Sequence, residues 1–185
     1  MSVDYKSTLQ LPVTEFPMRA GLAKKEPETV KFWERNGIYK KMLERNKDRR
    51  SFMFHDGPPY ANGAIHIGHA LNKSLKDFIV KYKSMRGYYV PYVPGWDTHG
   101  LPIELKVLKD EHLNKDTTPA LELRSECHDY ALKWVDVQRE GMKRLGCFSL
   151  WDEPYLTLKP EFEARELETL ATIVEKGFVY RGTKP

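Results

Sequence analysis

The 185-residue chain has few cysteines, no long apolar run and little net charge. Its two cysteines, Cys127 and Cys147, are not in Cys-x-x-Cys spacing, which argues against a disulfide framework or a thiolate zinc site. No apolar run approaches the roughly 20 residues of a membrane-spanning helix, and the N-terminus lacks a signal-peptide core, so we expect a cytoplasmic protein without membrane contact. A net charge of +4 permits a nucleic-acid partner without arguing for one.

The composition is that of an ordinary folded domain, with 41% apolar and 30% charged residues. Short apolar runs alternate with helical patterns, which predicts an α/β fold with a parallel sheet. The expected strands are 52–54, 88–93 and 155–158, and the expected helices are about 26–43 (interrupted at Gly37), 67–86, 103–113, 119–145 and 160–176. Residues 1 to about 24 show no periodicity and are expected to form an extended arm that includes Leu11, Pro12, Phe16, Pro17 and Met18.

The helix expected from Ile67 is amphipathic. One stripe carries the apolar residues Leu71, Leu75, Phe78, Ile79 and Tyr82. The opposite stripe carries Lys73, Lys76, Asp77, Lys81 and Lys83. We expect this charged stripe to be solvated, although it could also contact a polyanion.

Phe52 to His69 forms the most informative stretch, because a short apolar run, a loop rich in glycine and proline, and a helix follow one another. The first N–H groups of a helix have no internal partners, so this order favours a phosphate site. His66 and His69 would face the same anion, and Gly68 between them would let a ligand approach the backbone. Imidazole donors there could stabilise a transferring phosphate. The alternative is that both histidines only cap or pack the helix.

A second loop, Pro94–Pro102, follows the next expected strand. Asp97 would lie at the carboxyl end of that strand, where open α/β sheets bind ligands. A carboxylate beside the apolar wall of Trp96 suits a ligand with an ammonium group and a hydrophobic side chain, such as an amino acid. The alternative is an ordinary turn aspartate.

Four histidines lie in or beside the two loops, namely His55, His66, His69 and His99, with Asp56 and Asp97 nearby. Such a cluster could hold a metal. The pair on the helix is spaced i, i+3, however, and the helical zinc motif uses i, i+4. We therefore expect no metal site in this chain.

The run from Pro59 to His69, Pro-Tyr-Ala-Asn-Gly-x-x-His-Ile-Gly-His, resembles the first signature of the class I aminoacyl-tRNA synthetases. The run from Pro94 to Glu104 resembles the isoleucyl branch of that family, and the segments 4–9 and 16–19 are similar to its bacterial type. The resemblance covers essentially the whole chain. It implies an enzyme with a Rossmann-like domain that joins ATP and isoleucine into isoleucyl-adenylate and passes the isoleucyl group to tRNA(Ile), with Mg²⁺ accompanying ATP.

The resemblance also implies roles for the matched residues. His66 and His69 would be catalytic, and the ATP-binding residues would be Pro59, Tyr60, Asn62, Gly63, His66, Gly68 and His69. The amino-acid-binding residues would be Gly57, Pro58, Trp96, Asp97 and His99. It implies an arm and helical segment at 1–48, the first half of the catalytic domain at 49–177, and the start of a connective insertion at 178–185.

The family's second signature, a Lys-Met-Ser-Lys-Ser-like loop, is not in these residues, nor are the editing and anticodon-binding regions. We therefore expect an N-terminal fragment that is monomeric and poorly active alone. Zinc is possible in a full-length protein, without a site in this chain. Two other hypotheses stay open: a free-standing nucleotidylyltransferase with the same His-x-Gly-His chemistry, and a non-catalytic module that binds ATP or tRNA.

Overall fold

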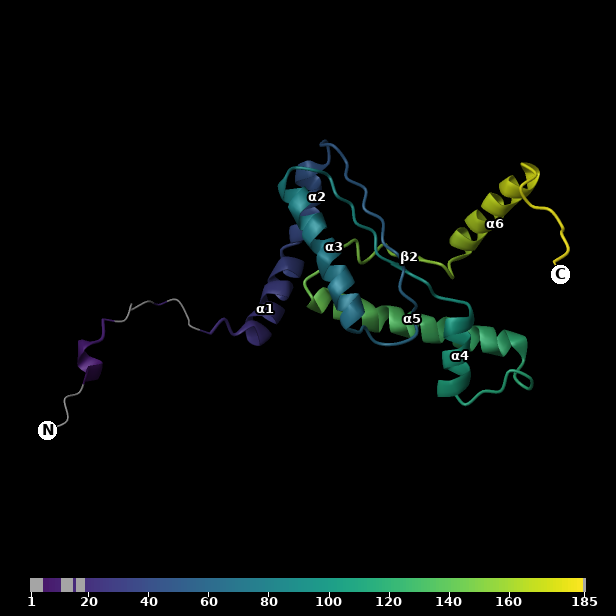
Figure 1. Cartoon of the computed structure of the whole chain (residues 1–185), viewed down its shortest axis with the longest axis horizontal. Coiled ribbons are helices and arrows are strands. Elements are labelled where there is room, and N and C mark those ends of the chain that lie inside the picture. Colours follow the sequence, from purple (N-terminus) through teal and green to yellow (C-terminus); the bar gives the residue numbers. More distant parts are fainter. Residues whose placement is uncertain (1–4, 11–14, 16–18, 185) are drawn as a thin grey trace.

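A computed structural model describes residues 5–10, 15 and 19–184, and helices make up most of its regular structure (Figure 1). In chain order the elements are η1 (Tyr5–Thr8), α1 (Leu22–Arg35), α2 (Ile38–Asn46), α3 (Ile67–Met85), β1 (Gly95–Trp96), α4 (Leu101–Asp110), α5 (Ala120–Arg144), β2 (Tyr155–Leu156) and α6 (Pro160–Glu175). The residues on which the expected arm depends, Leu11, Pro12 and 16–18, lie outside the described part of the chain.

Parallel pairing joins three segments that are far apart in the sequence. β1 pairs with β2 in parallel, with Gly95 opposite Tyr155 and Trp96 opposite Leu156. Two single parallel bridges, Ser51 to Tyr89 and Tyr60 to Asp97, add the segment before α3. The expected parallel arrangement is thus present, although the sheet is much smaller than predicted.

The first two expected strands are wrong as continuous strands. Of the 52–54 run, only the N–H of Phe52 joins the pairing, through a 2.8 Å bond to the Tyr89 carbonyl. In the 88–93 run, the Tyr39 hydroxyl bonds the Val90 carbonyl and the Tyr92 N–H, each at 2.8 Å, where a strand partner would otherwise lie. Prolines at 91 and 94 also lack N–H donors. Regular pairing instead occurs at 95–96, inside the expected second loop, and β2 covers only the first half of 155–158.

The helices match the sequence prediction more closely. Gly37 adopts a left-handed conformation (φ 56°) between α1 and α2, which confirms the predicted interruption. Gly87 (φ 84°) follows the end of α3, as a C-terminal glycine should. α1 begins at Leu22, four residues before the expected start, and Pro119 is the N-cap of α5 rather than its first helical residue.

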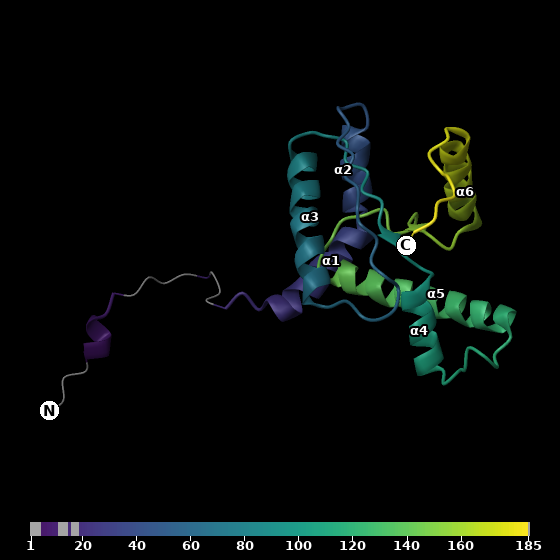
Figure 2. The same ribbon diagram turned by 45° about the vertical axis from the view of Figure 1, so that its right-hand side comes forward.

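Two buried clusters hold these elements together. One lies between the strands, α4 and α5 and includes Trp96, Ile103, Val107, Val135 and Met142. The other packs Val80 of α3 against Val90 and Tyr92, with aromatic side chains around them. Figures 1 and 2 both show α2 alongside α3, with the start of α3 close to α5.

The charged stripe of α3 faces inward, so the prediction that it is solvated is wrong. Lys73 and Asp77 are only 7% and 5% exposed, whereas the apolar residues Ile67, Phe78 and Met85 on the other side are 85%, 65% and 70% exposed. The buried charges are tolerated because they have partners: both Lys73 and Lys76 bond the Asp56 carboxylate, and Lys81 bonds that of Asp77.

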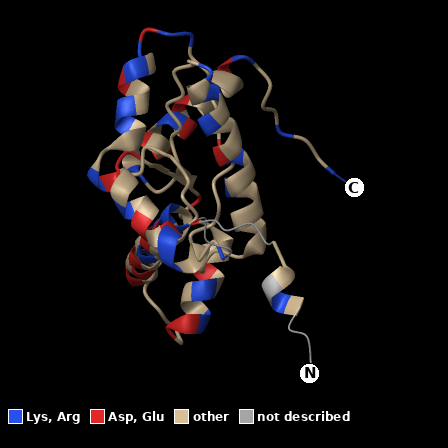
Figure 3. Ribbon diagram, turned by 90° about the vertical axis from the view of Figure 1, so that its left-hand side faces the viewer, with Lys and Arg blue, Asp and Glu red and all other residues tan. Residues whose placement is uncertain are grey.

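Acidic and basic residues are interspersed along the helices of the described chain (Figure 3). Within the described part of the chain, no helix is both long enough and apolar enough to cross a membrane.

Candidate active site

His66 and His69 shape the start of α3 through their own side chains. His66 is the N-cap, and its Nδ1 accepts the Gly68 N–H at 3.0 Å. The Nδ1 of His69 in turn accepts the backbone N–H of His66 at 3.3 Å. This reciprocal arrangement satisfies backbone donors that a helix start leaves free. The capping role that the sequence left open is therefore real, and it is compatible with a chemical role for the other ring nitrogen.

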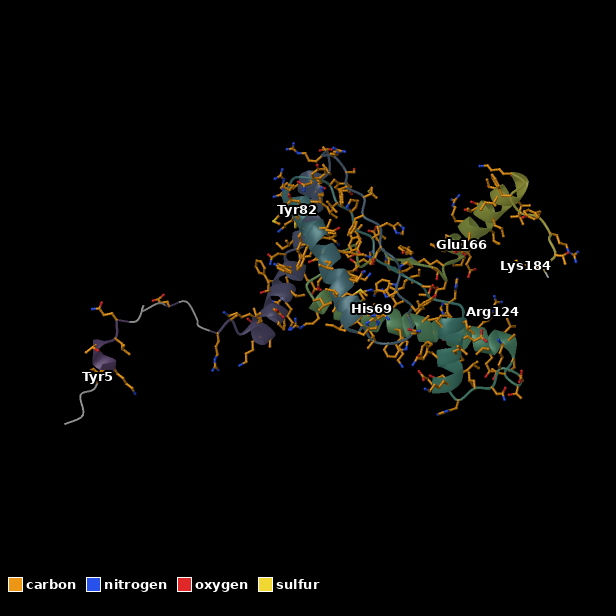
Figure 4. All side chains as sticks on the ribbon, in the orientation of Figure 1. Tyr5, His69, Tyr82, Arg124, Glu166 and Lys184 are labelled. Atoms are coloured by element: carbon orange, nitrogen blue, oxygen red, sulfur yellow. The ribbon has the colours of Figure 1, made fainter. Side chains whose placement is uncertain are left out.

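The hydrogen bonds determine where each neutral imidazole carries its proton. Because each Nδ1 is an acceptor, the neutral ring is protonated at Nε2. The two rings stack with centroids 3.9 Å apart. Burial lowers the pKa of His69, and the nearby His66 and Lys73 lower it further. His69 is consequently neutral at pH 7 and offers an Nε2–H donor; Figure 4 labels it at the start of α3.

Gly68 is required by the position of the His66 ring. A Cβ at residue 68 would lie 2.8 Å from Cε1 and 3.0 Å from Nδ1 of His66, closer than side chains approach. From the sequence we expected this glycine to allow the close approach of a ligand. In the structure, the group that approaches it is the imidazole that caps the helix.

The two loops identified in the sequence lie side by side. The Asp97 N–H donates to the Pro59 carbonyl and the Ala61 N–H donates to the Asp97 carbonyl, both at 2.9 Å. The Asn62 side chain reaches the Pro102 carbonyl at 3.4 Å. Gly57 is exposed and Pro58 is half-buried. The expected ATP loop and the expected amino-acid loop are thus joined through their backbones.

The expected amino-acid residues differ in accessibility. Asp97 is half-buried, and its Oδ1 lies 3.5 Å from the Thr157 hydroxyl. The His99 Nε2 lies 3.1 Å from the Thr157 carbonyl oxygen and 3.9 Å from a carboxylate oxygen of Glu163. Trp96 has no exposed surface, so its ring belongs to the core and does not form an open wall beside Asp97.

An ion triad ties the loop before Gly57 to α3. The carboxylate of Asp56 is buried and bonds the ammonium groups of Lys73 and Lys76. Burial alone would raise the pKa of Asp56, but the two lysines outweigh it and hold that pKa below its usual value. The Asp56 carbonyl also accepts the Tyr155 hydroxyl at 2.9 Å. The sequence argument missed this triad, because it treated the lysines as solvated.

Gln138 of α5 is a second residue that sequence reasoning missed. Its amide bonds the carbonyls of Tyr60 and Gly63 as well as the indole of Trp96. It is a polar residue on the buried stripe that also carries Tyr130, Ala131, Val135 and Met142. A polar side chain on an apolar stripe is the sequence signal that could have identified it.

The described residues contain no group of three or more His, Cys, Asp or Glu side chains placed to hold a metal ion. His55 instead faces the Tyr155 ring, with centroids 6.1 Å apart. A groove of about 690 Å³ lies between the α1–α2 junction and segment 146–153, lined by Trp33, Tyr39, Phe148 and Trp151 among others. None of the expected site residues lines that groove, so it is separate from the candidate active site.

Comparison with known proteins places these features in a family. The family model for class I tRNA synthetases (I, L, M and V) matches residues 28–185. The chain is 55% identical to isoleucine–tRNA ligases of Caldicellulosiruptor bescii and Moorella thermoacetica, and 53% identical to that of Bacillus subtilis. Each alignment covers 99% of this chain and 20% of the relative, so the chain spans about 20% of the length of these curated relatives.

A solved structure shares the fold. It is the agnB2 LeuRS of Agrobacterium radiobacter, crystallised as a ternary complex with tRNA and LeuAMS. The match has a TM-score of 0.67 at 22% identity and covers 89% of this chain and 19% of that one. Since the family model covers most of the sequence, the chain belongs to the class I tRNA synthetases (I, L, M and V).

Proposed function

We propose that the chain serves isoleucine–tRNA ligation, carrying one side of the active site that activates isoleucine with ATP and transfers it to tRNA(Ile). Identity of 53–55% to isoleucine–tRNA ligases over nearly the whole chain supports this substrate. The observation that carries the chemistry is the pair of stacked imidazoles at the start of α3, each with Nδ1 engaged by a backbone N–H. Their Nε2–H groups remain for a ligand.

In the proposed first step, the isoleucine carboxylate attacks the α-phosphorus of ATP and pyrophosphate leaves. Negative charge builds up on the phosphate oxygens of the five-coordinate transition state. The Nε2–H groups of His66 and His69 donate to those oxygens, and the positive end of the α3 dipole favours the same charge. Two backbone N–H groups here already bond the imidazoles, so the rings are the donors offered to the anion.

The loops provide the rest of the proposed site. Pro59, Tyr60, Asn62 and Gly63 shape the ATP side, with Gly68 allowing the His66 ring to lie over the helix start. Gly57, Pro58, Asp97 and His99 serve the amino-acid side, where the Asp97 carboxylate takes the substrate ammonium group. Trp96 contributes by supporting Asp97 from the core. Mg²⁺ accompanies ATP and is held mainly by its phosphates.

The same proposal extends to the organisation of the chain. Residues 49–177 form the first half of the catalytic domain, 1–48 an arm and helical segment, and 178–185 the start of a connective insertion. We propose a monomeric, cytoplasmic protein.

The test is isoleucine-dependent ATP–pyrophosphate exchange by the full-length protein. Replacing His66 or His69 by alanine should lower the exchange rate by about 10²–10³-fold each, the effect of removing one donor to a developing oxyanion. Thermal unfolding of each variant provides the control for folding. Exchange that responds to no amino acid would instead favour a free-standing nucleotidylyltransferase, and unchanged activity in both variants would favour a non-catalytic module.

A further inference from the structure

Gln138 lies beneath the candidate active site and uses its whole amide group. The residue is 1% exposed. Its Nε2 donates to the carbonyl oxygens of Tyr60 at 2.9 Å and Gly63 at 2.7 Å. Its Oε1 accepts the indole N–H of Trp96 at 3.0 Å. Both amide protons and the carbonyl oxygen are therefore engaged in a buried place, where unpaired polar groups are costly.

These three bonds connect the two loops of the site to one helix. Tyr60 and Gly63 belong to the loop that leads into α3, while Trp96 is the last residue of β1 and directly precedes Asp97. The loops also bond each other at Tyr60 and Asp97. One side chain of α5 thus helps to set the spacing between the proposed phosphate donors and the proposed carboxylate.

Gly141 lies one turn further along α5, beneath the same loop. A Cβ at this position would lie 2.8 Å from Cδ1 and 3.1 Å from Cγ1 of Ile65. Glycine inside a helix is unfavourable relative to alanine. Its presence here is explained by Ile65, the residue before His66, which needs this space on the surface of α5.

We propose that Gln138 and Gly141 are positioning residues for the adenylation site. On the basis of the proposed function, α5 holds residues 60–65 in the conformation that places His66. Gln138 bonds the carbonyls of Tyr60 and Gly63 in that segment. Gly141 has no side chain and so leaves room for Ile65 at the end of the segment. Neither residue is assigned a contact with the reacting atoms.

The two positions require particular side chains. Methionine at 138 keeps the length of glutamine but leaves two carbonyls and an indole N–H without partners. Glutamate keeps the acceptor for Trp96 but loses both donors and buries a charge. Alanine at 141 adds one methyl group against Ile65, and its higher helix propensity should preserve α5 itself.

The decisive experiment uses Gly141→Ala in the full-length protein and measures kcat and KM for ATP in isoleucine-dependent exchange. Displacement of the segment before His66 should lower kcat/KM by about 10- to 100-fold, the scale of a small misplacement of catalytic groups, without loss of thermal stability. Ile65→Val removes the Cδ1 atom that the new methyl group would meet. Combined with Gly141→Ala, it should restore most of the lost kcat/KM. Because Gly141→Ala itself leaves the thermal stability unchanged, this recovery would report the position of the segment before His66 and not the folding of the chain.

Gln138→Met gives a second test, with Met142→Leu as a matched control on the neighbouring turn of α5. We expect Gln138→Met to raise KM for ATP and lower kcat. Met142→Leu should leave both within about twofold, because it replaces one buried apolar side chain by another of similar volume. Exchange by Gly141→Ala within twofold of the parent, or no recovery with Ile65→Val, would overturn the inference. If the parent protein shows no isoleucine-dependent exchange, the proposed function itself fails, so the two failures are distinguishable.

Discussion

Two long helices of the chain, α3 and α5, bury opposite kinds of side chain. α5 buries apolar side chains such as Ala131, Val135 and Met142, and Gln138 is the one polar residue among them. α3 buries Lys73, Asp77 and Ser84 together with a single apolar residue, Val80. The apolar stripe of α3, including Leu71 and Phe78, is exposed.

The difference shows that amphipathic spacing does not determine which stripe of a helix faces inward. The buried charges of α3 are acceptable because each has polar partners from another part of the chain. Asp56 pairs with Lys73, and Asp77 accepts the Phe148 N–H at 2.8 Å in addition to the Lys81 ammonium group. Lys81 also donates to the Gly146 carbonyl at 2.8 Å. Such pairs can replace an apolar contact only when most of their bonds are made.

The largest expected effect comes from removing the acid of the α3 triad. Asp56→Ala leaves the buried Lys73 ammonium group without its carboxylate. We expect the free energy of unfolding to fall by about 3–5 kcal/mol, the usual result of breaking a buried ion pair on one side. Urea denaturation followed by tryptophan fluorescence measures it. Glu44→Ala, which removes an exposed partner of Lys47, is the control and should cause no resolvable change.

The corresponding change in α5 removes an apolar side chain. Met142→Ala should lower the free energy of unfolding by about 2–4 kcal/mol, because it deletes buried contacts and leaves a cavity. The same urea titration measures it. A loss well below 1 kcal/mol would mean that α5 is not held by its apolar stripe as the structure indicates.

The two helices should also differ in their response to acid. The lysines lower the pKa of Asp56 in the folded chain, so its contribution is complete above about pH 5, begins to decline near the ordinary pKa of about 4, and is lost as the pH falls through the lowered pKa. The measurement is the free energy of unfolding at pH 7 and at pH 3. Between these two pH values it should fall less for Asp56→Asn than for the parent. For Met142→Ala, the free energy of unfolding should fall on acidification by as much as it does for the parent, because the pairing of Asp56 with Lys73 and Lys76 is intact. Equal acid sensitivity in all three proteins would contradict the assignment.

The smallest effect is expected on the outer stripe of α3. Leu71→Gln changes an exposed residue to another good helix former, so the free energy of unfolding should change by less than about 0.5 kcal/mol. The same urea titration measures it. Val80→Gln on the inner stripe of the same helix is the matched control and should destabilise the chain strongly. Similar losses from both changes would remove the distinction between the two stripes.

Local signals predicted the helices well and the strands poorly. The start of α3 at Ile67 and its end before Gly87 depend on residues within a few positions of each boundary. The predictions of strands at 52–54 and 88–93 were wrong because strand pairing needs a distant partner. The Tyr39 hydroxyl makes the hydrogen bonds of Val90 and Tyr92 instead. The composition of the two loops led to the hypothesis of a site, and the structure joins the loops through the parallel bridge between Tyr60 and Asp97.

The sequence by itself determined the positions of the helices, the pairing of His66 with His69 around Gly68, and membership of the synthetase family through its motifs. These features depend on bonds between neighbours in the chain. Only the tertiary structure decided that the lysine stripe of α3 faces inward, that Trp96 is buried, and that Gln138 supports both loops. Those outcomes depend on partners such as Asp56 and Gln138 that lie 17 to 78 residues away from the groups they bond, where short-range patterns carry no information.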